Sequence, residues 1–296
     1  MQKTNIGICG LGTVAGGVIN VWQRNQALLA QRMLRPCNIT HIGARRDNPA
    51  CDTDAYTVSR DIFAVVNDPA VHIVVELIGG IEPARQLVLQ AIAAGKHVVT
   101  ANKALIAEHG NELLAAASAA GVELRYEAAV AGGIPVIKAL TEGFSANAIE
   151  SIVGIINGTG NFILTEMRDK DRSFADALAD AQRLGYAEAD PTFDVEGIDA
   201  AQKLTILAAL AYGVPLDASQ CYVEGITHIS VDDMRYAKEL GYCIKHLGIA
   251  RSNNHGLELR VHPALIPKSR LIAHVDGVLN AVAIHGDAVG PTLLCG

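Results

Sequence analysis

The chain has 296 residues and a formal net charge of −7, with 50% hydrophobic but only 4% aromatic residues. This length is enough for two domains, with cores built mainly from Ala, Val, Ile and Leu. No cluster of Lys or Arg resembles a nucleic-acid surface, so we expect no nucleic-acid partner. The first residues enter an expected strand without the apolar region of a signal peptide, and no apolar stretch approaches the ~20 residues of a membrane span. We therefore expect a soluble, cytoplasmic protein with no membrane partner.

The cysteines show no pattern of metal binding or disulfide formation. They are Cys9, Cys37, Cys51, Cys221, Cys243 and Cys295. None forms a C-x-x-C pair, and the spacings fit neither a zinc site nor a disulfide framework. We expect ordinary reduced thiols, as in cytosolic proteins.

Over roughly the first 130 residues, short β-branched runs alternate with longer segments rich in Ala and Leu. The expected strands cover residues 6–9, 39–42, 72–78, 97–100 and 122–127. The expected helices cover residues 14–32, 82–94 and 104–120, with Gly95 and Gly121 where C-terminal caps belong. This alternation predicts an α/β domain over 1–130 with a doubly wound, parallel sheet of the Rossmann type.

The pattern changes after Pro135. A strand is expected at 149–157 and helices at 173–184 and 197–212. Looser elements follow Ser219, and strand-like alternation returns over 257–286. We predict an α+β domain over 131–296 that binds the substrate and, through its exposed sheet, a second subunit.

The first expected strand runs into a glycine-rich turn, Gly10-Leu-Gly-Thr-Val-Ala15. In a dinucleotide fingerprint, Gly10 permits the tight turn and Gly12 lets the backbone approach the pyrophosphate. A small residue such as Ala15 lets the following helix pack on the strand. The strand–turn–helix context favours dinucleotide binding over the alternative of a purely structural turn.

The end of the second expected strand bears on the choice of dinucleotide. NAD-specific proteins normally place an Asp or Glu there, on the ribose hydroxyl. This chain instead has Arg45 and Arg46, which suit the extra phosphate of NADP. We predict NADP as the cofactor, with NAD as the alternative. The alternative for the two arginines is a purely structural role in a solvated basic turn.

Two further strand ends are expected at the same edge of the sheet, where open α/β sheets bind ligands. One carries the paired glycines Gly79 and Gly80, and the other carries Asn102 and Lys103. Lys103 is interpreted as a functional cation, although a solvated lysine in the first helical turn is the simpler alternative.

The stretch from Gly185 to Lys203 is the most informative for chemistry. Asp199 and Lys203 lie four apart on a helix that is otherwise apolar almost all round. Desolvating an ion pair there is hard to explain by stability alone. A partly desolvated lysine beside a carboxylate can give and take a proton. Glu188 could hold a substrate ammonium, whereas Asp190 and Asp194 are interpreted as turn residues.

At this point the chain resembles the homoserine dehydrogenase family over its whole length. The matching segments are Gly10-Leu-Gly-Thr-Val14, Ala101-Asn-Lys103, Glu127-Ala-Ala-Val-Ala-Gly-Gly-Ile-Pro135, Gly154-Ile-Ile-Asn-Gly-Thr-Gly-Asn161, Gly185 to Lys203, and Gly286-Asp-Ala-Val-Gly-Pro-Thr292. The resemblance implies NAD(P)-linked interconversion of L-homoserine and L-aspartate 4-semialdehyde, in the pathway to threonine, methionine and isoleucine. It also implies a homodimer or a dimer of dimers.

The resemblance assigns roles to individual residues. It makes Lys203 the proposed proton donor and Asp199 and Glu188 contacts of the substrate. It makes Lys103 a lysine at the junction of cofactor and substrate, which is the alternative group for the proton transfer. The cofactor side is implied for Leu11, Thr13, Val14 and Arg45, together with the glycines of the turn. A sodium ion is implied on Glu127, Val130, Gly132 and Ile134, through a carboxylate and backbone carbonyls.

The sequence departs from the family pattern in two places. The pattern Asn-Gly-Thr-Thr-Asn has Gly160 in place of the second threonine, which removes a hydroxyl near the expected substrate crevice. Family members also continue beyond the position of Gly296, through a glycine-rich loop over the nicotinamide, a helix that returns to the first domain and often a regulatory ACT domain. We therefore expect a C-terminally shortened protein with low turnover.

Two other functions compete with this interpretation. A semialdehyde dehydrogenase would need an activated cysteine, and none of the six has an obvious activating setting. A non-catalytic NADP-sensing dimer would explain the glycine-rich turn but leave Glu188, Asp199 and Lys203 without a role.

Overall fold

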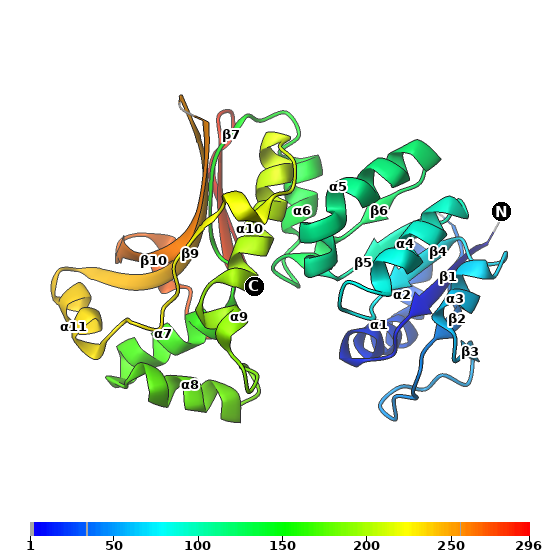
Figure 1. Ribbon diagram of the computed structural model, residues 1–296, viewed down its shortest axis with the longest axis horizontal. Helices are drawn as coiled ribbons and strands as arrows, with labels where there is room; N and C mark the ends of the chain where they lie inside the picture. Colours follow the sequence, from blue (N-terminus) through cyan, green and yellow to red (C-terminus); the bar gives the residue numbers. More distant parts are fainter. Residues whose placement is uncertain (1–2, 34, 255) are drawn as a thin grey trace. The chain divides into compact units, whose positions relative to one another are not determined.

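A computed structural model describes residues 3–33, 35–254 and 256–296 of the chain. The chain divides into two compact units, Met1–Ala129 and Val130–Gly296. Each unit is built around its own sheet, and the two sheets can be followed in Figure 1.

The first unit contains a six-stranded sheet in which every pair of neighbouring strands is parallel. The strand order is β3-β2-β1-β4-β5-β6, the order of a Rossmann dinucleotide-binding fold. The strands are β1 (Thr4–Cys9), β2 (Cys37–Gly43), β3 (Thr57–Ser59), β4 (Ile73–Glu76), β5 (His97–Thr100) and β6 (Leu124–Arg125). This sheet confirms the predicted doubly wound α/β fold.

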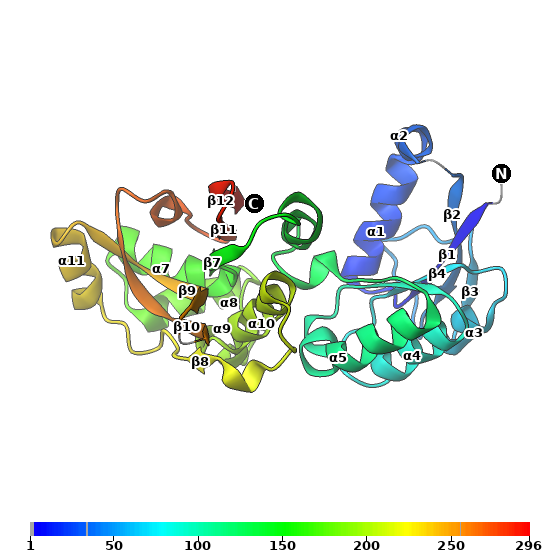
Figure 2. The same ribbon diagram turned by 90° about the horizontal axis from the view of Figure 1, so that it is seen from above.

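Helices cover both faces of this sheet (Figure 2). The helices on one face are α1 (Thr13–Arg24) and α2 (Gln26–Arg32), and those on the other are α3 (Ile62–Asn67), α4 (Ala84–Ala93) and α5 (Lys103–Ala120). Helix α1 buries Ala15, Gly16 and Ile19, and Ala15 and Ile19 join Ile8 and Ile42 in one apolar cluster. A short 3-10 helix, η1 (Glu127–Ala129), ends the unit.

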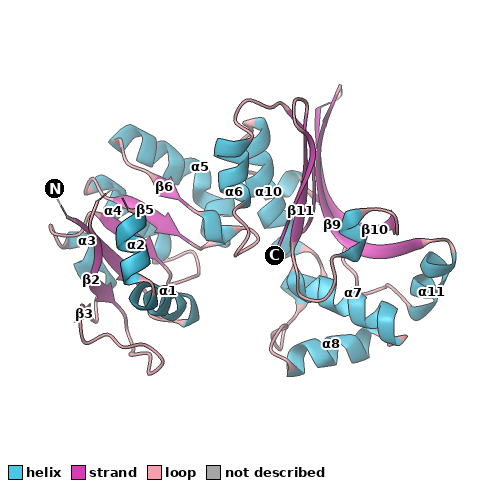
Figure 3. Cartoon of the chain, turned by 180° about the vertical axis from the view of Figure 1, so that it is seen from behind, coloured by secondary structure: helices cyan, strands magenta, loops and turns pink. Residues whose placement is uncertain are grey.

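The second unit contains a mixed six-stranded sheet of order β12-β11-β7-β9-β10-β8. Its strands are β7 (Ile149–Ile155), β8 (Tyr222–Val223), β9 (Tyr242–Asn253), β10 (Gly256–Pro267), β11 (Ala281–Gly286) and β12 (Gly290–Cys295). All neighbours are antiparallel except β8 and β10. The long hairpin of β9 and β10 can be followed in Figure 3. The unit therefore has the predicted α+β character.

The helices of the second unit pack their apolar sides on this sheet and on one another. The α-helices are α6 (Val136–Lys138), α7 (Gly158–Lys170), α8 (Phe174–Arg183), α9 (Thr192–Val195), α10 (Ile198–Tyr212) and α11 (Val231–Glu239). A π-helix, η2 (Ala139–Gly143), and two 3-10 helices, η3 (Ala218–Gln220) and η4 (Leu271–His274), accompany them. Helix α10 lies close on β9, because a Cβ at Gly248 would be only 3.5 Å from Leu204 Cδ1. Within the described ranges, no helix is long and apolar enough to cross a membrane.

The structure corrects several expected elements. The helix expected at 14–32 is two helices, because α1 ends at Arg24 and Asn25 leaves the helical region with φ −109° and ψ 16°. The looser region expected after Ser219 contains α11 and the twelve-residue strand β9. Residues 243–248 of β9 are all buried, so the strand lacks the alternation that would have revealed it. The strand expected at 122–127 is reduced to Leu124–Arg125.

Candidate functional site

In the first unit, the turn between β1 and α1 is shaped by two glycines with different roles. Gly10 has φ +103°, and a Cβ there would lie 2.5 Å from the Leu77 carbonyl oxygen. Only glycine suits this position. Gly12 caps α1 with ordinary backbone angles, and a Cβ there would have no atom within 4 Å. The backbone at Gly12 is therefore open to a ligand at the amide-rich start of a helix, which suits a pyrophosphate.

The other residues assigned to the cofactor occupy different environments. Leu11 is buried in the apolar cluster under α1, so its backbone and not its side chain would face a ligand. Thr13 and Val14 are exposed in the first turn of α1. Arg45 is exposed just beyond the end of β2, as is Arg46. These positions leave both guanidinium groups accessible to a phosphate.

Glu76, a residue that the sequence did not single out, ties two neighbouring strand ends together. Its buried carboxylate accepts hydrogen bonds from Ile78 N at 2.8 Å and from Thr100 Oγ1 at 2.5 Å. Asn102 caps α5 through Leu105 N and donates to the Gly80 carbonyl at 2.6 Å. The ends of β4 and β5 are thereby held by side chains as well as by the sheet.

In the second unit, the start of α10 carries the predicted pair of charged residues. Lys203 Nζ lies 2.6 Å from Asp199 Oδ2 and donates to the Ile156 carbonyl at 2.8 Å. The Asp199 side chain is 2% exposed and that of Lys203 is 17% exposed. The ammonium is therefore held by two oxygens but keeps some access to its surroundings, as a proton-transfer group requires.

Two residues not predicted for the site complete this network. Asn157 caps α7, and its Nδ2 donates to Asp199 Oδ2 at 2.9 Å and to Asp194 Oδ1 at 2.7 Å. Asp194 was interpreted as a turn residue, and the structure instead brings its carboxylate to the same amide group as Asp199. An Asn between a strand and a helix is a recognisable cap signal, but nothing local to Asp194 indicates its partner. Asp190 does cap a turn, through Thr192 N.

His246 lies beneath the starts of both helices. A Cβ at Gly197 would lie 3.0 Å from its Cε1, and one at Gly160 would lie 3.8 Å from its Nδ1. Its Nε2 donates to the Glu224 carbonyl at 2.9 Å, whereas Nδ1 has no hydrogen-bond partner among the described residues. Burial lowers the pKa of His246, and His262 lowers it further, against the opposing effects of Glu224 and Glu196. The imidazole is therefore neutral at pH 7.

The remaining predicted residues are not part of this network. The Glu188 side chain is exposed in the loop between α8 and α9, and its backbone carbonyl accepts from Gln182 at 3.1 Å. Lys103 begins α5 in the first unit and is partly buried. Their roles stay predictions.

The sodium ligands also stay a prediction. Val130 and Ile134 are buried and Gly132 is exposed, around a sharp turn at Ala131 with φ 46°. Glu127 is the first residue of η1. No group of three or more His, Cys, Asp or Glu that could hold a metal occurs among the described residues, so a metal here would depend on backbone oxygens.

Four of the six cysteines provide no activated nucleophile for an acyl-enzyme mechanism. Burial, with smaller effects of Glu76 and Asp61, raises the pKa of Cys9 to about 12. Burial also raises the pKa of Cys221 to about 11 and raises that of Cys37 and Cys243. A thiol with a raised pKa carries little thiolate at neutral pH. This disfavours the semialdehyde dehydrogenase alternative at these four positions.

The Rossmann sheet and its open glycine turn define a dinucleotide-binding protein, and the lysine–carboxylate pair indicates an enzyme. Comparison with known families narrows this class. A family model described as "Homoserine dehydrogenase, NAD binding domain" matches residues 10–127, and one described as "Homoserine dehydrogenase" matches residues 135–296.

Comparison with individual relatives and solved structures points to the same family as the two family models. Homoserine dehydrogenase of Pseudomonas aeruginosa is 61% identical and that of Neisseria gonorrhoeae 52% identical, each over 100% of this chain and 68% of the relative. A crystal structure of a homoserine dehydrogenase from Thiobacillus denitrificans superposes with a TM-score of 0.96 at 58% identity, over 100% of this chain and 69% of that one. A structure of a hyperthermophilic archaeal homoserine dehydrogenase in complex with NADPH gives a TM-score of 0.82 at 26% identity, over 100% of this chain and 92% of that one.

The chain belongs to the homoserine dehydrogenase family. It spans about two thirds of the length of the curated relatives (68% of each of the two named above). Membership makes it an oxidoreductase that uses a nicotinamide dinucleotide and acts on a CH–OH group. The resemblance inferred from the sequence motifs is confirmed.

The two glycines of the turn should respond differently to alanine. Gly10→Ala should destabilise the first unit by ~1–3 kcal/mol or more, because the new Cβ meets the Leu77 carbonyl and the φ is unfavourable. Gly12→Ala should leave stability unchanged within ~0.5 kcal/mol but weaken dinucleotide binding. Urea unfolding and calorimetric titration measure the two effects, and equal affinities of wild type and Gly12→Ala would contradict the assignment.

His246 should make stability depend on pH. Its pKa is lower in the folded protein than the usual value of about 6.5 in the unfolded chain. The unfolded state therefore binds the proton first, and stability is lost as the pH falls below about 6.5, by ~1 kcal/mol per pH unit. His246→Gln should flatten this dependence in urea unfolding at several pH values. Equal slopes for wild type and His246→Gln would rule out this contribution.

Proposed function

We propose that this chain interconverts L-homoserine and L-aspartate 4-semialdehyde with NADP, and that Lys203 handles the proton of the substrate oxygen. One observation carries the proposal: the ammonium of Lys203 is held at 2.6 Å by the buried Asp199 at the start of an apolar helix. Burying a charged pair in such surroundings has a desolvation cost that stability alone does not explain, and membership of the family supplies a functional reason for it.

The reaction requires one proton to move for every hydride. In the oxidative direction, neutral Lys203 would accept the hydroxyl proton of homoserine, and the hydride of the adjacent C–H would pass to the dinucleotide when it is bound. In the reductive direction, the ammonium gives a proton to the aldehyde oxygen. Asp199 and the Ile156 carbonyl orient the nitrogen and stabilise its charged form. Asn157 in turn holds the carboxylate of Asp199 in place.

The first unit is proposed to hold the dinucleotide. When bound, the nicotinamide supplies the hydride acceptor or donor. Gly10 shapes the turn, and the backbone of Leu11, Gly12, Thr13 and Val14 would face the pyrophosphate, where the space at Gly12 is open. The open, exposed position of Arg45 supports NADP as the preferred dinucleotide, with NAD as the alternative.

Recognition of the substrate is proposed to involve carboxylates and a second lysine. Asp199 and the exposed Glu188 are suited to an amino acid, because each can accept hydrogen bonds from its ammonium group. Lys103 is proposed to contact both substrate and cofactor, on the basis of the family resemblance alone.

A sodium ion is proposed on the same basis, with the Glu127 carboxylate and the carbonyls of Val130, Gly132 and Ile134 as ligands. The turn at Ala131, with φ 46°, lies among the three carbonyls, of which that of Ile134 also accepts a hydrogen bond from Val136 N at 2.8 Å. Hard oxygen ligands of this kind suit such a cation.

A homodimer or dimer of dimers is proposed through the second sheet. Its strands carry apolar side chains that are only partly buried, namely Val153, Ile249, Ala264, Ile266 and Leu293. Covering such a row with a second copy would remove apolar surface from water. We place the protein in the cytoplasm, as the features of its sequence indicate, and in threonine, methionine and isoleucine biosynthesis, as the family resemblance implies.

The proton role of Lys203 is tested by Lys203→Arg. Arginine keeps the positive charge beside Asp199, but its pKa is too high for it to release a proton. We expect the rate of NADP reduction by homoserine, followed at 340 nm, to fall by about 10²–10⁴-fold, while calorimetry shows unchanged NADP binding. The same measurements separate the alternatives, because an NADP sensor would show no turnover in the wild type. Equal kcat values for wild type and Lys203→Arg would refute the mechanism.

The preference for NADP is tested by Arg45→Ser. Loss of a charged hydrogen bond to the extra phosphate should weaken NADP binding by about tenfold, equivalent to roughly 1.5 kcal/mol, and leave NAD binding unchanged. Arg35→Ser is the matched control, because Arg35 is also an exposed arginine of the first unit. The preference is wrong in this form if the variant binds NADP as tightly as the wild type does.

A further inference from the structure

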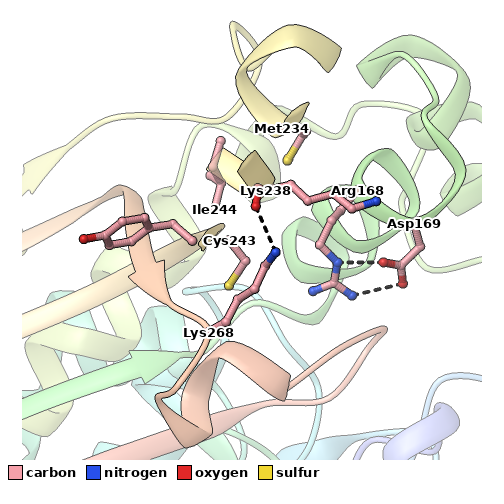
Figure 4. A pocket seen from close by; sticks show the side chains of 8 residues that line it. Arg168, Asp169, Met234, Lys238, Cys243, Ile244 and Lys268 are labelled. Atoms are coloured by element: carbon pink, nitrogen blue, oxygen red, sulfur yellow. Dashed lines mark hydrogen bonds and ion pairs between the residues drawn. The ribbon is translucent and has the colours of Figure 1, made fainter. Parts of the chain in front are cut away.

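The second unit contains a cavity of about 320 Å³ that the proposed reaction does not use. The end of α7, helix α11, the first residues of β9 and the segment after β10 form its walls (Figure 4). Met234, Cys243 and Ile244 are buried and make its floor apolar. Lys238, Lys268 and Arg168 line it with positive charge, and Asp169, which is paired with Arg168, contributes one negative charge. The volume lies at the small end of the range for sites that bind small molecules.

The two lysines of this cavity, Lys238 and Lys268, are not paired with carboxylates within the described part of the chain. Lys268 Nζ donates to the Lys238 carbonyl at 3.1 Å, which holds it at the rim, as Figure 4 shows. Arg168, in contrast, is paired with Asp169 at 2.7 Å and Asp276 at 2.8 Å.

We propose that this cavity binds a small organic carboxylate with a short apolar body. The ammonium groups of Lys238 and Lys268 would bind the carboxylate, and the floor of Met234, Cys243 and Ile244 would cover the apolar part. Neither element alone selects this ligand: exposed lysines bind anions weakly, and the apolar floor does not discriminate by charge. Together they favour an amphipathic anion over inorganic phosphate and over a neutral compound.

The cavity is also connected to the proposed catalytic group by hydrogen bonds. Arg168 Nη1 and the buried Lys245 Nζ both lie 2.8 Å from Asp276 Oδ1. Lys245, which is only 1% exposed, also donates to Asn161 Oδ1 at 3.3 Å. Asn161 lies in the first turn of α7, and its backbone N donates to the Asn157 carbonyl at 3.2 Å.

Helix α7 therefore carries a cavity residue near one end and the partner of Asp199 at the other. A ligand that draws Arg168 toward the cavity would disturb Asp276 and Lys245, and through them the turn that holds Asn157. We infer that occupancy of the cavity changes the rate of the reaction. This part of the inference rests on the proposed role of Lys203, whereas the binding of a carboxylate does not.

Calorimetric titration tests the binding. The probes are butanoate, its neutral counterpart butanamide, and inorganic phosphate. We expect butanoate to bind with a Kd of about 1 mM or tighter, and phosphate and butanamide to bind at least about tenfold more weakly. The double variant Lys238→Ala/Lys268→Ala should lose butanoate binding, and Lys170→Ala, an exposed lysine outside the cavity, should keep it. Absence of butanoate binding, or equal binding by the double variant, would overturn the site.

Steady-state kinetics with saturating butanoate tests the connection. We expect kcat/KM for homoserine to change by about fivefold in the wild type and in Lys170→Ala. Asp276→Asn should still bind butanoate but lose this change, because its amide cannot hold both cations. Binding without any change in rate would overturn the connection and leave the site standing. Failure of the proposed function would instead appear with Lys203→Arg and would not affect the calorimetry.

Discussion

The ion pair between Lys203 and Asp199 imposes the strictest physical condition on the second unit. Removing two charges from water costs several kcal/mol per ion unless each is hydrogen-bonded as well as paired. The structure meets this condition with the Ile156 carbonyl on the lysine and the Asn157 amide on the carboxylate. Both groups come from the junction that follows β7, so α10 must pack against that junction for the charges to be tolerated. The packing of α10 against this junction therefore also supplies the hydrogen bonds that the buried ion pair requires.

Both units position their functional groups where a strand passes into a helix. In the first unit, Gly10 allows the chain to pass the Leu77 carbonyl, and the backbone at Gly12 remains open. In the second unit, Asn157 follows β7 and caps α7, and Gly158 passes close to the Val278 carbonyl, 2.8 Å from where a Cβ would lie. The first junction presents backbone amides, which suit phosphates. The second presents side chains, which suit proton transfer and the orientation of a carboxylate.

Buried polar groups extend well beyond the proposed catalytic lysine. Lys245 is fully buried yet bound to Val275 O, Asp276 and Asn161, so its charge is satisfied. His246, its neighbour on β9, points to the starts of α7 and α10 and stays neutral because it is buried. One strand thus supports the site through a charged and a neutral side chain. The high pKa of the buried thiols Cys9 and Cys221 agrees with hydride chemistry in place of thiol chemistry.

Features that depend on short spacing could be predicted from the amino-acid pattern. The turn from Gly10 to Ala15 is a contiguous signal, and Asp199 and Lys203 meet because residues four apart share one face of a helix. The residues that complete the site are selected by the folded arrangement of the chain. Asn157 reaches Asp199 across 42 positions, and no local pattern encodes that distance. Strand β9 also could not be recognised from the sequence, because a strand buried on both faces lacks the alternation of apolar and polar residues. Local spacing fixes only near neighbours, whereas long-range partners are chosen by how strands and helices pack.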